Sequence, residues 1–230
     1  MSSAVQPPAP GAGAADFIRL HARPLAVALC PELRLYQVDA LTALWQIGER
    51  ELGEAGVEVP FWAVAWPGGQ ALARFMLDAP QFVRGARVLD LGTGSGVAAI
   101  AAARAGAASV RGIDPDPMAI AAVRLNAALN AVRIGTATAD PLAGDPPADA
   151  DVLLAADLWY ERAMAQRVTP WLRRAAATGL RVLAADPGRS YLPREGLLEL
   201  ECYDVPTSTE LERAAVTPTR VFQLLADALP

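Results

Sequence analysis

Arg87-Val-Leu-Asp-Leu-Gly-Thr-Gly-Ser-Gly-Val97 is the stretch of this 230-residue sequence that decides its fold. The apolar run Val88–Leu91 predicts a buried strand, the alternate glycines of residues 92–96 predict a turn, and the alanine-rich segment after Val97 predicts a helix. This order is the first half of a βαβ unit. Glycine permits positive φ and close approach of a ligand, and the junction of a strand end with a helix start is the usual ligand position in open α/β sheets.

Two classes of ligand compete for such a loop. A dinucleotide requires Gly-x-Gly-x-x-Gly for its pyrophosphate, but position 97 is valine and the carboxylate of Asp90 would repel phosphate. A ligand with an ammonium group and no phosphate, such as S-adenosylmethionine (SAM), suits that carboxylate better. The next predicted strand, Ser109–Ile113, ends at Asp114, about 20 residues past the glycines, where an acid can bind both ribose hydroxyls. Both ligands predict this acid, and a purely structural glycine turn is the third alternative.

Composition restricts the class of protein. A chain of 230 residues that is 53% hydrophobic can bury one sizeable core, which predicts one domain with an amino-terminal extension. The net charge of −5 and the pI of about 5.0 argue against phosphate neutralisation, so we expect no nucleic-acid partner. Arg104 and Arg111 interrupt the longest apolar run, so we expect no membrane span.

Cysteine and histidine are scarce. Cys30 and Cys202 are too few for a disulfide framework or a zinc site, which predicts a reducing compartment, and we expect the cytoplasm. His21 is the only histidine and is far along the chain from the glycine loop. A histidine base and a histidine-ligated metal are therefore not expected.

The first residues carry weaker signals. Residues 1–15 contain Ser, Ala, Pro and Gly without charge, which predicts a disordered tail. Residues 16–58 are interpreted as a helical extension. Its first helix is predicted over Asp16–Leu29, with Asp16 as the cap and a break at Pro24. A strand over Glu32–Tyr36 and a helix from Val38 to Leu52 follow. The main domain is then expected to occupy residues 59–230.

Strands and helices alternate through most of this main domain. The predicted helices are Gln70–Leu77, Val97–Ala105, Met118–Asn130 and, despite Pro170, Arg162–Ala177. The later predicted strands are Ile134–Ala139, Asp151–Ala156 and Leu180–Ala185, followed by a hairpin-like pair over Leu197–Tyr203 and Thr219–Leu225. Alternation of this kind predicts a parallel sheet with right-handed crossovers.

Aromatic and acidic side chains gather near the predicted strand ends. Phe61, Trp62 and Trp66 are expected on a loop, where they stack on adenine, wall a substrate pocket, or simply fix the loop to the core. Asp140 follows the third strand, where it either binds the adenine amino group or begins a loop. Asp186-Pro-Gly-Arg189 follows the fifth strand and is either a tight turn or a contact with a protein substrate.

Four motifs occur in an order that resembles a known family. They are Trp66-Pro-Gly-Gly-Gln-Ala71, Val88-Leu-Asp-Leu-Gly-Thr-Gly-Ser-Gly96, Asp157-Leu-Trp-Tyr160 and Asp186-Pro-Gly-Arg189. The chain resembles the seven-β-strand protein-lysine methyltransferases over roughly residues 30–225, and within them the electron transfer flavoprotein β-subunit lysine methyltransferases. The resemblance implies a Rossmann-like α/β fold: a seven-stranded sheet, mostly parallel with an antiparallel closing strand, and helices on both faces. The proline-rich turn Pro115-Asp-Pro117 departs from the pattern.

The motifs and the resemblance together assign roles to residues. The expected cofactor-binding residues, for SAM, are Trp66, Asp90, Gly92, Gly94, Gly96, Asp114, Pro115, Asp140 and Asp157. The expected substrate-binding residues are Phe61, Trp62, Tyr160, Asp186 and Arg189. Asp157 and Tyr160 are the expected catalytic residues, the first orienting the amine and the second walling a lysine channel, although Asp157 is also suited to cap the helix after it. Because SAM carries an activated methyl group, no metal is required.

The resemblance implies lysine methylation of the electron transfer flavoprotein β-subunit, a protein partner. The lysine amine has a free pKa of about 10.4, so the pocket must favour its neutral form through desolvation and the nearby sulfonium charge. Another acceptor, such as a ribosomal protein similar to L11 or a nucleic acid, is the first alternative, although Leu158-Trp159 departs from the Asn/Asp-Pro-Pro-Tyr signature common in nucleic-acid amino methylation. A non-enzymatic nucleotide-binding module is the second.

Overall fold

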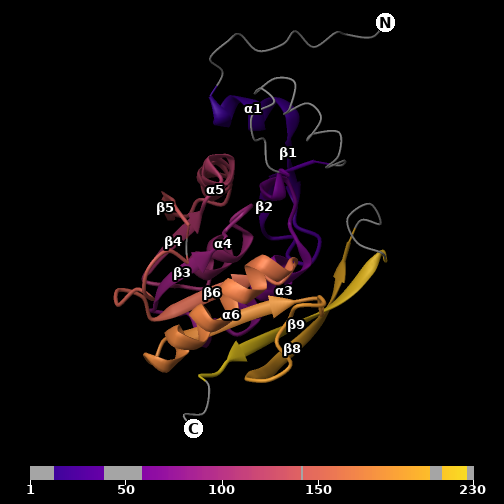
Figure 1. The fold of residues 1–230 in the computed structure, drawn as a ribbon. Helices are drawn as coiled ribbons and strands as arrows, with labels where there is room; N and C mark the ends of the chain where they lie inside the picture. Colours follow the sequence, from indigo (N-terminus) through magenta and orange to yellow (C-terminus); the bar gives the residue numbers. More distant parts are fainter. Residues whose placement is uncertain (1–12, 39–58, 141, 208–213, 227–230) are drawn as a thin grey trace, which may run out of the picture.

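A seven-stranded sheet forms the centre of the protein (Figure 1). The computed structural model describes residues 13–38, 59–140, 142–207 and 214–226. The strands, in the spatial order β5-β4-β3-β6-β7-β9-β8, are β3 (Arg87–Leu91), β4 (Ser109–Asp114), β5 (Gly135–Thr138), β6 (Val152–Ala156), β7 (Arg181–Asp186), β8 (Leu197–Pro206) and β9 (Val216–Leu224). Strands β3 to β7 are parallel, and β9 is antiparallel to both β7 and β8. The expected sheet is therefore confirmed.

Helices cover both faces of this sheet. They are α3 (Pro67–Asp78), α4 (Val97–Arg104), α5 (Pro117–Leu129) and α6 (Arg162–Ala177). Successive strand residues point to opposite faces, so Val152 and Leu154 of β6 pack with α3 and α4, whereas Leu153 and Ala155 pack with α6. Small alanine side chains make up most of α4, which allows α3 to pack closely against it. The helix with an internal proline, α6, is formed as predicted.

The described amino-terminal residues contain a helix and a hairpin. Helix α1 (Ala14–His21) is followed by β1 (Arg23–Ala26) and β2 (Arg34–Gln37), which pair antiparallel. The prediction of a helix to Leu29 was wrong after His21, because Pro24 cannot continue a helix and instead lies opposite Tyr36 in the hairpin. The N-cap of α1 is Gly13, and Asp16 forms an ion pair with Arg19 at 3.2 Å instead of capping the helix.

Two predictions for this region fall on residues that the structure does not describe. The disordered tail was predicted for residues 1–15, of which 1–12 lie outside the described residues, while Ala14 and Ala15 belong to α1. The helix from Val38 to Leu52 also lies outside them from residue 39 onward. The strand predicted over Glu32–Tyr36 is present as β2, and its partner β1 lies where a helix was predicted.

The aromatic segment leads directly into α3. A short 3-10 helix, η1 (Phe61–Ala63), is followed by Trp66 as the N-cap of α3, and the helix begins at Pro67, earlier than predicted, because proline is well suited to a first helical position. A second 3-10 helix, η2 (Pro80–Phe82), connects α3 to β3. Within the described ranges, no helix combines the length and the apolar character needed to cross a bilayer.

Candidate functional site

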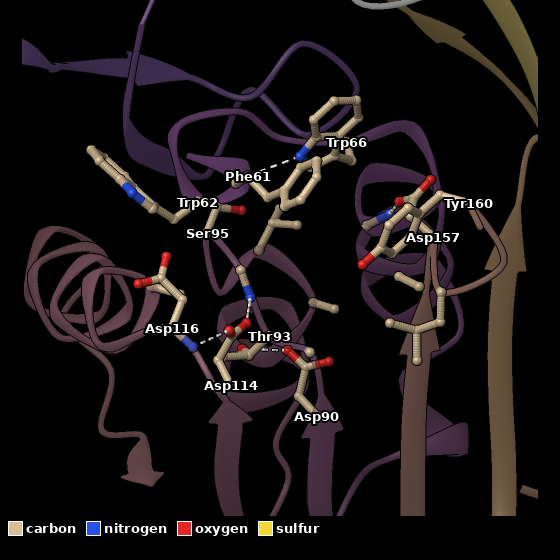
Figure 2. Close-up of a pocket in the computed structure, with 18 of the residues that line it drawn as sticks. Phe61, Trp62, Trp66, Asp90, Thr93, Ser95, Asp114, Asp116, Asp157 and Tyr160 are labelled. Atoms are coloured by element: carbon tan, nitrogen blue, oxygen red, sulfur yellow. Dashed lines mark hydrogen bonds between the residues drawn. The ribbon is translucent and has the colours of Figure 1, made fainter. Parts of the chain in front are cut away.

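A cavity of about 350 Å³ opens at the carboxyl ends of β3, β4 and β6 (Figure 2). It lies at the predicted ligand position for an open α/β sheet. The predicted site residues that line it are Phe61, Trp62, Trp66, Asp90, Gly92, Gly94, Asp114, Pro115, Asp157, Tyr160 and Arg189. Gly96, Asp140 and Asp186 were also predicted for the site but are not among its lining residues.

The glycine loop forms one wall of the cavity. Gly92 and Gly94 have φ values of +60° and +50°, and the Gly94 N–H donates to Asp114 Oδ2 at 2.9 Å. Gly96 serves a structural purpose instead: it is the N-cap of α4 with φ +79°, and a Cβ there would lie 3.1 Å from the side chain of Val123 in α5. Gly96 thus packs the loop against α5, and its contact with the cofactor stays a prediction.

Asp90 is buried beneath this loop. It is 2% exposed and accepts a hydrogen bond from Thr93 Oγ1 at 2.6 Å. Burial raises the pKa of Asp90 to about 7, because the charged form loses its hydration, and the hydrogen bond from Thr93 only partly opposes this effect. The carboxyl group thus changes its protonation state near neutral pH.

The acids of the Asp-Pro-Asp-Pro segment have separate tasks. Asp114, at the end of β4, also accepts from the Asp116 N–H through Oδ1 at 3.0 Å. Asp116 is the N-cap of α5, where it accepts from the Met118 N–H at 2.7 Å, and Pro117 is the first helical residue. The proline-rich turn that departed from the family pattern is therefore an ordinary helix start. Asp116 also lines the cavity, a role that the sequence analysis missed.

Asp157 joins two of the sequence motifs. Its Oδ2 accepts from the Gly69 N–H at 2.9 Å, so the carboxylate lies at the amino end of α3, where the helix dipole favours negative charge. A Cβ at Gly68 would lie 2.6 Å from the same oxygen. Asp157 therefore caps α3, which lies far upstream in the chain, instead of the helix that follows it. The glycines of Trp-Pro-Gly-Gly are required because the Asp157 carboxylate approaches them so closely.

Asp186 holds Arg189 in place. The Asp186 carboxylate is buried and accepts from the N–H groups of Gly188 and Arg189 at 2.7 and 2.6 Å, which fixes the tight turn. The Arg189 side chain reaches into the cavity, where Nη2 lies 3.6 Å from Asp157 Oδ1. Asp186 is not among the lining residues and its carboxylate holds the turn, so contact between Asp186 and the substrate stays a prediction.

The ionisation of Asp157 reflects this environment. Burial raises its pKa to about 7, the positive charge of Arg189 opposes the increase, and the negative charge of Asp186 adds to it. The Gly68 and Gly69 amides also favour the charged form. Like Asp90, Asp157 therefore titrates near neutral pH.

Aromatic side chains line the same cavity as Asp157. Phe61 lies between Trp66 and Tyr160, with ring centroids 5.8 and 5.6 Å away, and the Trp66 indole N–H donates to the Phe61 carbonyl at 2.8 Å. Phe61 and Tyr160 are 40% and 44% exposed, so they form the rim of the cavity. Trp62 points the other way, toward Asp116, and packs with α1 and α5 (Figure 2).

Asp140 does not belong to the cavity. It accepts from the Leu142 N–H at 2.9 Å and pairs with Arg167, and both contacts lower its pKa. These contacts favour the interpretation that Asp140 begins the loop after β5, and its contact with adenine stays a prediction.

Several lining residues were missed by the sequence analysis. They are Val59, Gly69, Thr93, Ser95, Val97, Ala98, Asp116, Ala119, Ala156, Leu158 and Met164. Many are apolar or small and carry no chemical signal of their own. Three of them lie within the predicted glycine loop or at its end, so their position next to a ligand was accessible from the sequence.

The charges of the cavity are unbalanced. Among the described residues that line it are four carboxylates, of Asp90, Asp114, Asp116 and Asp157, and one guanidinium, of Arg189. Over the same described part of the chain, no group of three or more potential metal ligands is found. The arrangement suits a ligand with positive charge and leaves little to hold a phosphate.

Comparison with known proteins gives the class of protein. Residues 72–159 match the sequence profile of the family described as ribosomal protein L11 methyltransferase (PrmA). The solved RNA methyltransferase from Salinibacter ruber, in complex with S-adenosyl-L-homocysteine, has a TM-score of 0.51 and 20% identity, covering 72% of this chain and 97% of that chain. The fold is that of the Rossmann-like methyltransferases.

Full-length relatives identify the family within this class. The electron transfer flavoprotein β-subunit lysine methyltransferase of Xenopus laevis is 39% identical over 212 residues, which cover 90% of this chain and 85% of the relative. The corresponding protein of Danio rerio is 37% identical, over 71% of this chain and 66% of the relative. The chain belongs to the family of electron transfer flavoprotein β-subunit lysine methyltransferases.

Proposed function

We propose that this protein is a SAM-dependent protein-lysine methyltransferase and that its substrate is the electron transfer flavoprotein β-subunit. The observation that carries the proposal is the excess of carboxylates over guanidinium groups in a cavity formed by a glycine loop. SAM carries a sulfonium and an ammonium, a lysine side chain is also cationic, and neither brings a phosphate. The names of the relatives supply the substrate, since these proteins are 37–39% identical to this chain over most of its length.

The residues of the cavity fit SAM in one orientation. Asp114 lies at the strand end suited to ribose hydroxyls, and the N–H groups of Gly94 and Asp116 hold its two oxygens in place there. We place the adenosine between Asp114 and Trp62, on the side of α5, and the reactive end beside Asp157 and Tyr160. This orientation exchanges the roles expected for two tryptophans: Trp62 borders the cofactor, and Trp66 stands with Phe61 at the lysine entrance (Figure 2).

When bound, SAM supplies an activated methyl group on its sulfonium. The protein holds the amine near that carbon, because correct placement provides most of the rate in a displacement of this kind. Asp157 orients the amine, while the rings of Phe61 and Tyr160 remove water from around it and lower the lysine pKa. Arg189 lies beside Asp157, so the carboxylate does not act on the lysine as an isolated negative charge.

We also propose the cytoplasm, or another reducing compartment, as the place of action. Cys30 and Cys202 are both free thiols, the first buried and the second exposed. The acidic surface makes a nucleic-acid substrate the weaker alternative.

Incubation with SAM carrying a radiolabelled methyl group tests the function. The purified protein is given electron transfer flavoprotein, ribosomal protein L11 and total RNA in separate reactions. We expect label only on the flavoprotein β-subunit, on lysine by mass spectrometry, and none with Asp157→Ala. Label on L11 or RNA alone would show that the proposed flavoprotein substrate is wrong. The absence of label on every acceptor would contradict the assignment as a methyltransferase.

A further inference from the structure

Two asparagines, Asn126 of α5 and its C-cap residue Asn130, hold the amino-terminal hairpin. Asn126 and Asn130 are one helical turn apart on the same face of α5. Asn130 binds both backbone groups of Arg34, accepting from its N–H at 3.0 Å and donating to its carbonyl at 2.6 Å. Asn126 accepts from the Tyr36 N–H at 2.8 Å. The two side chains therefore occupy the edge of β2 that a further strand would otherwise pair with.

Asn126 differs from Asn130 in its second contact. Its Nδ2 donates to the carbonyl of Ser95 at 2.8 Å, whereas Asn130 donates its other hydrogen bond to the backbone of α5 itself. Asn126 is fully buried, and Ser95 is a lining residue of the cavity. A single side chain thus connects the hairpin to the glycine loop.

The glycine loop needs such external support. Ser95 lies between Gly94 and Gly96, which both have positive φ and can adopt many other backbone conformations. The loop is fixed from outside by Asp114 at Gly94 and by Asn126 at Ser95. Without the Asn126 amide, the buried Ser95 carbonyl would lose that hydrogen bond, and the Ser95–Gly96 peptide would keep its N–H bond to the Thr93 carbonyl at 2.7 Å, which lies within the same loop.

A second contact ties the hairpin to the opposite wall. The Val38 N–H, just after β2, donates to the Ala63 carbonyl of η1 at 3.1 Å. Trp62 of η1 packs with Phe17 and Ile18 of α1. The amino-terminal elements therefore contact both walls of the cofactor end of the cavity.

We propose that Asn126 is a positioning residue for the cofactor site and that it couples the amino-terminal hairpin to SAM binding. The inference rests on the proposed function only in taking SAM as the ligand. Asn126 is not a lining residue of the cavity; it binds the carbonyl of Ser95, which is one. The hairpin is then part of the binding machinery instead of an appendage.

Asn130 provides a matched control. Asn126→Asp keeps the acceptor for Tyr36 but loses the donor to Ser95, and Asn130→Asp keeps the acceptor for Arg34 but loses its donors. Titration calorimetry with SAM should show binding weakened about three- to tenfold in N126D, the loss of one buried hydrogen bond. N130D should bind within about twofold of the wild type, although both variants melt at lower temperature. Equal affinities in the two variants would overturn the proposal.

Hydrogen exchange on the unmodified protein tests the same coupling without relying on a variant that folds. Because coupling between sites is reciprocal, saturating SAM should slow exchange at the Tyr36 amide. Amides of the β8–β9 hairpin, at the far edge of the sheet, should be unaffected. If SAM binds but leaves Tyr36 unchanged, the coupling is wrong. If SAM does not bind at all, the proposed function fails instead.

Discussion

Arg189 controls the charge of Asp157, so Arg189→Gln should displace the pH dependence of methyl transfer. At the observed separation of 3.6 Å, two unit charges attract by about 4.6 kcal/mol with an effective dielectric constant of about 20. Arg189 is partly exposed, which reduces this value, and an opposite charge at such distances shifts a pKa by about 1 to 3 units. The pKa of Asp157 is about 7 with Arg189 present. Without Arg189, Asp157 should be protonated at neutral pH and ionise only in alkaline solution.

The assay is the initial rate of methylation of the flavoprotein across the pH range. In R189Q, the acid limb of kcat/KM should move upward by at least about 1 unit, with recovery toward the wild-type value at alkaline pH. An isolated Asp157 carboxylate would also hold the proton on the lysine more tightly, which moves the limb in the same direction. Arg162→Gln is the control, since Arg162 packs over the Tyr191 ring and carries the same charge. An acid limb at its wild-type position, or an equal loss at every pH, would refute the reasoning.

Three further changes test the site. Asp114→Ala should weaken SAM binding by about tenfold or more in calorimetry, because losing hydrogen bonds to a charged group costs about 1.5–3 kcal/mol. Unchanged affinity would show that Asp114 does not bind the ribose. Asp90→Asn should raise the urea midpoint of unfolding at pH 8 to 9. A buried acid with a raised pKa contributes its full stability at a pH below its pKa in the unfolded chain, and that contribution is lost as the pH rises through the folded pKa of about 7. Equal midpoints for the variant and the wild type would contradict this. Gly68→Ala should abolish turnover by displacing Asp157. Gly135→Ala is the control and should leave turnover unchanged, because a Cβ there meets nothing closer than 3.6 Å. Similar activities of the two variants would show that the close approach of Asp157 to Gly68 is unimportant.

Local patterns allowed most of the sheet to be predicted from the sequence. The strand, glycine loop and helix of residues 87–104 follow from the apolar run, the alternate glycines and the alanines, all within a short window. The same kind of reasoning failed at Pro24. The sequence placed a broken helix there because the pairing that makes β1 a strand depends on Tyr36, beyond the range of helical periodicity.

Contacts between distant segments limited the prediction of the site. Asp157 and Gly69 are separated by 88 positions in the chain, and neither motif alone indicates that the carboxylate caps α3. Asp140 and Asp186 were assigned to the ligand because they follow strands, but strand ends also require loop-forming residues. Both carboxylates are used by the turns next to them. Asp114 also follows a strand and accepts an N–H group of its turn, yet it lines the cavity. Position at a strand end therefore selects candidates, and only the three-dimensional structure shows which of them line the cavity.

Asp157 shows why the site concentrates unusual features in one residue. Its φ is +57°, a conformation that costs free energy for a residue with a Cβ, and its carboxyl group is buried. A glycine would remove the backbone strain but leave the amino end of α3 without its side-chain acceptor. The surrounding structure compensates for both costs: the Asp157 N–H donates to the Ala185 carbonyl at 3.0 Å, Gly69 binds Oδ2, and Arg189 faces Oδ1. Because contacts from α3 and from the end of β7 hold Asp157, the carboxylate is fixed before any substrate arrives, which is what placement of an amine for in-line displacement requires.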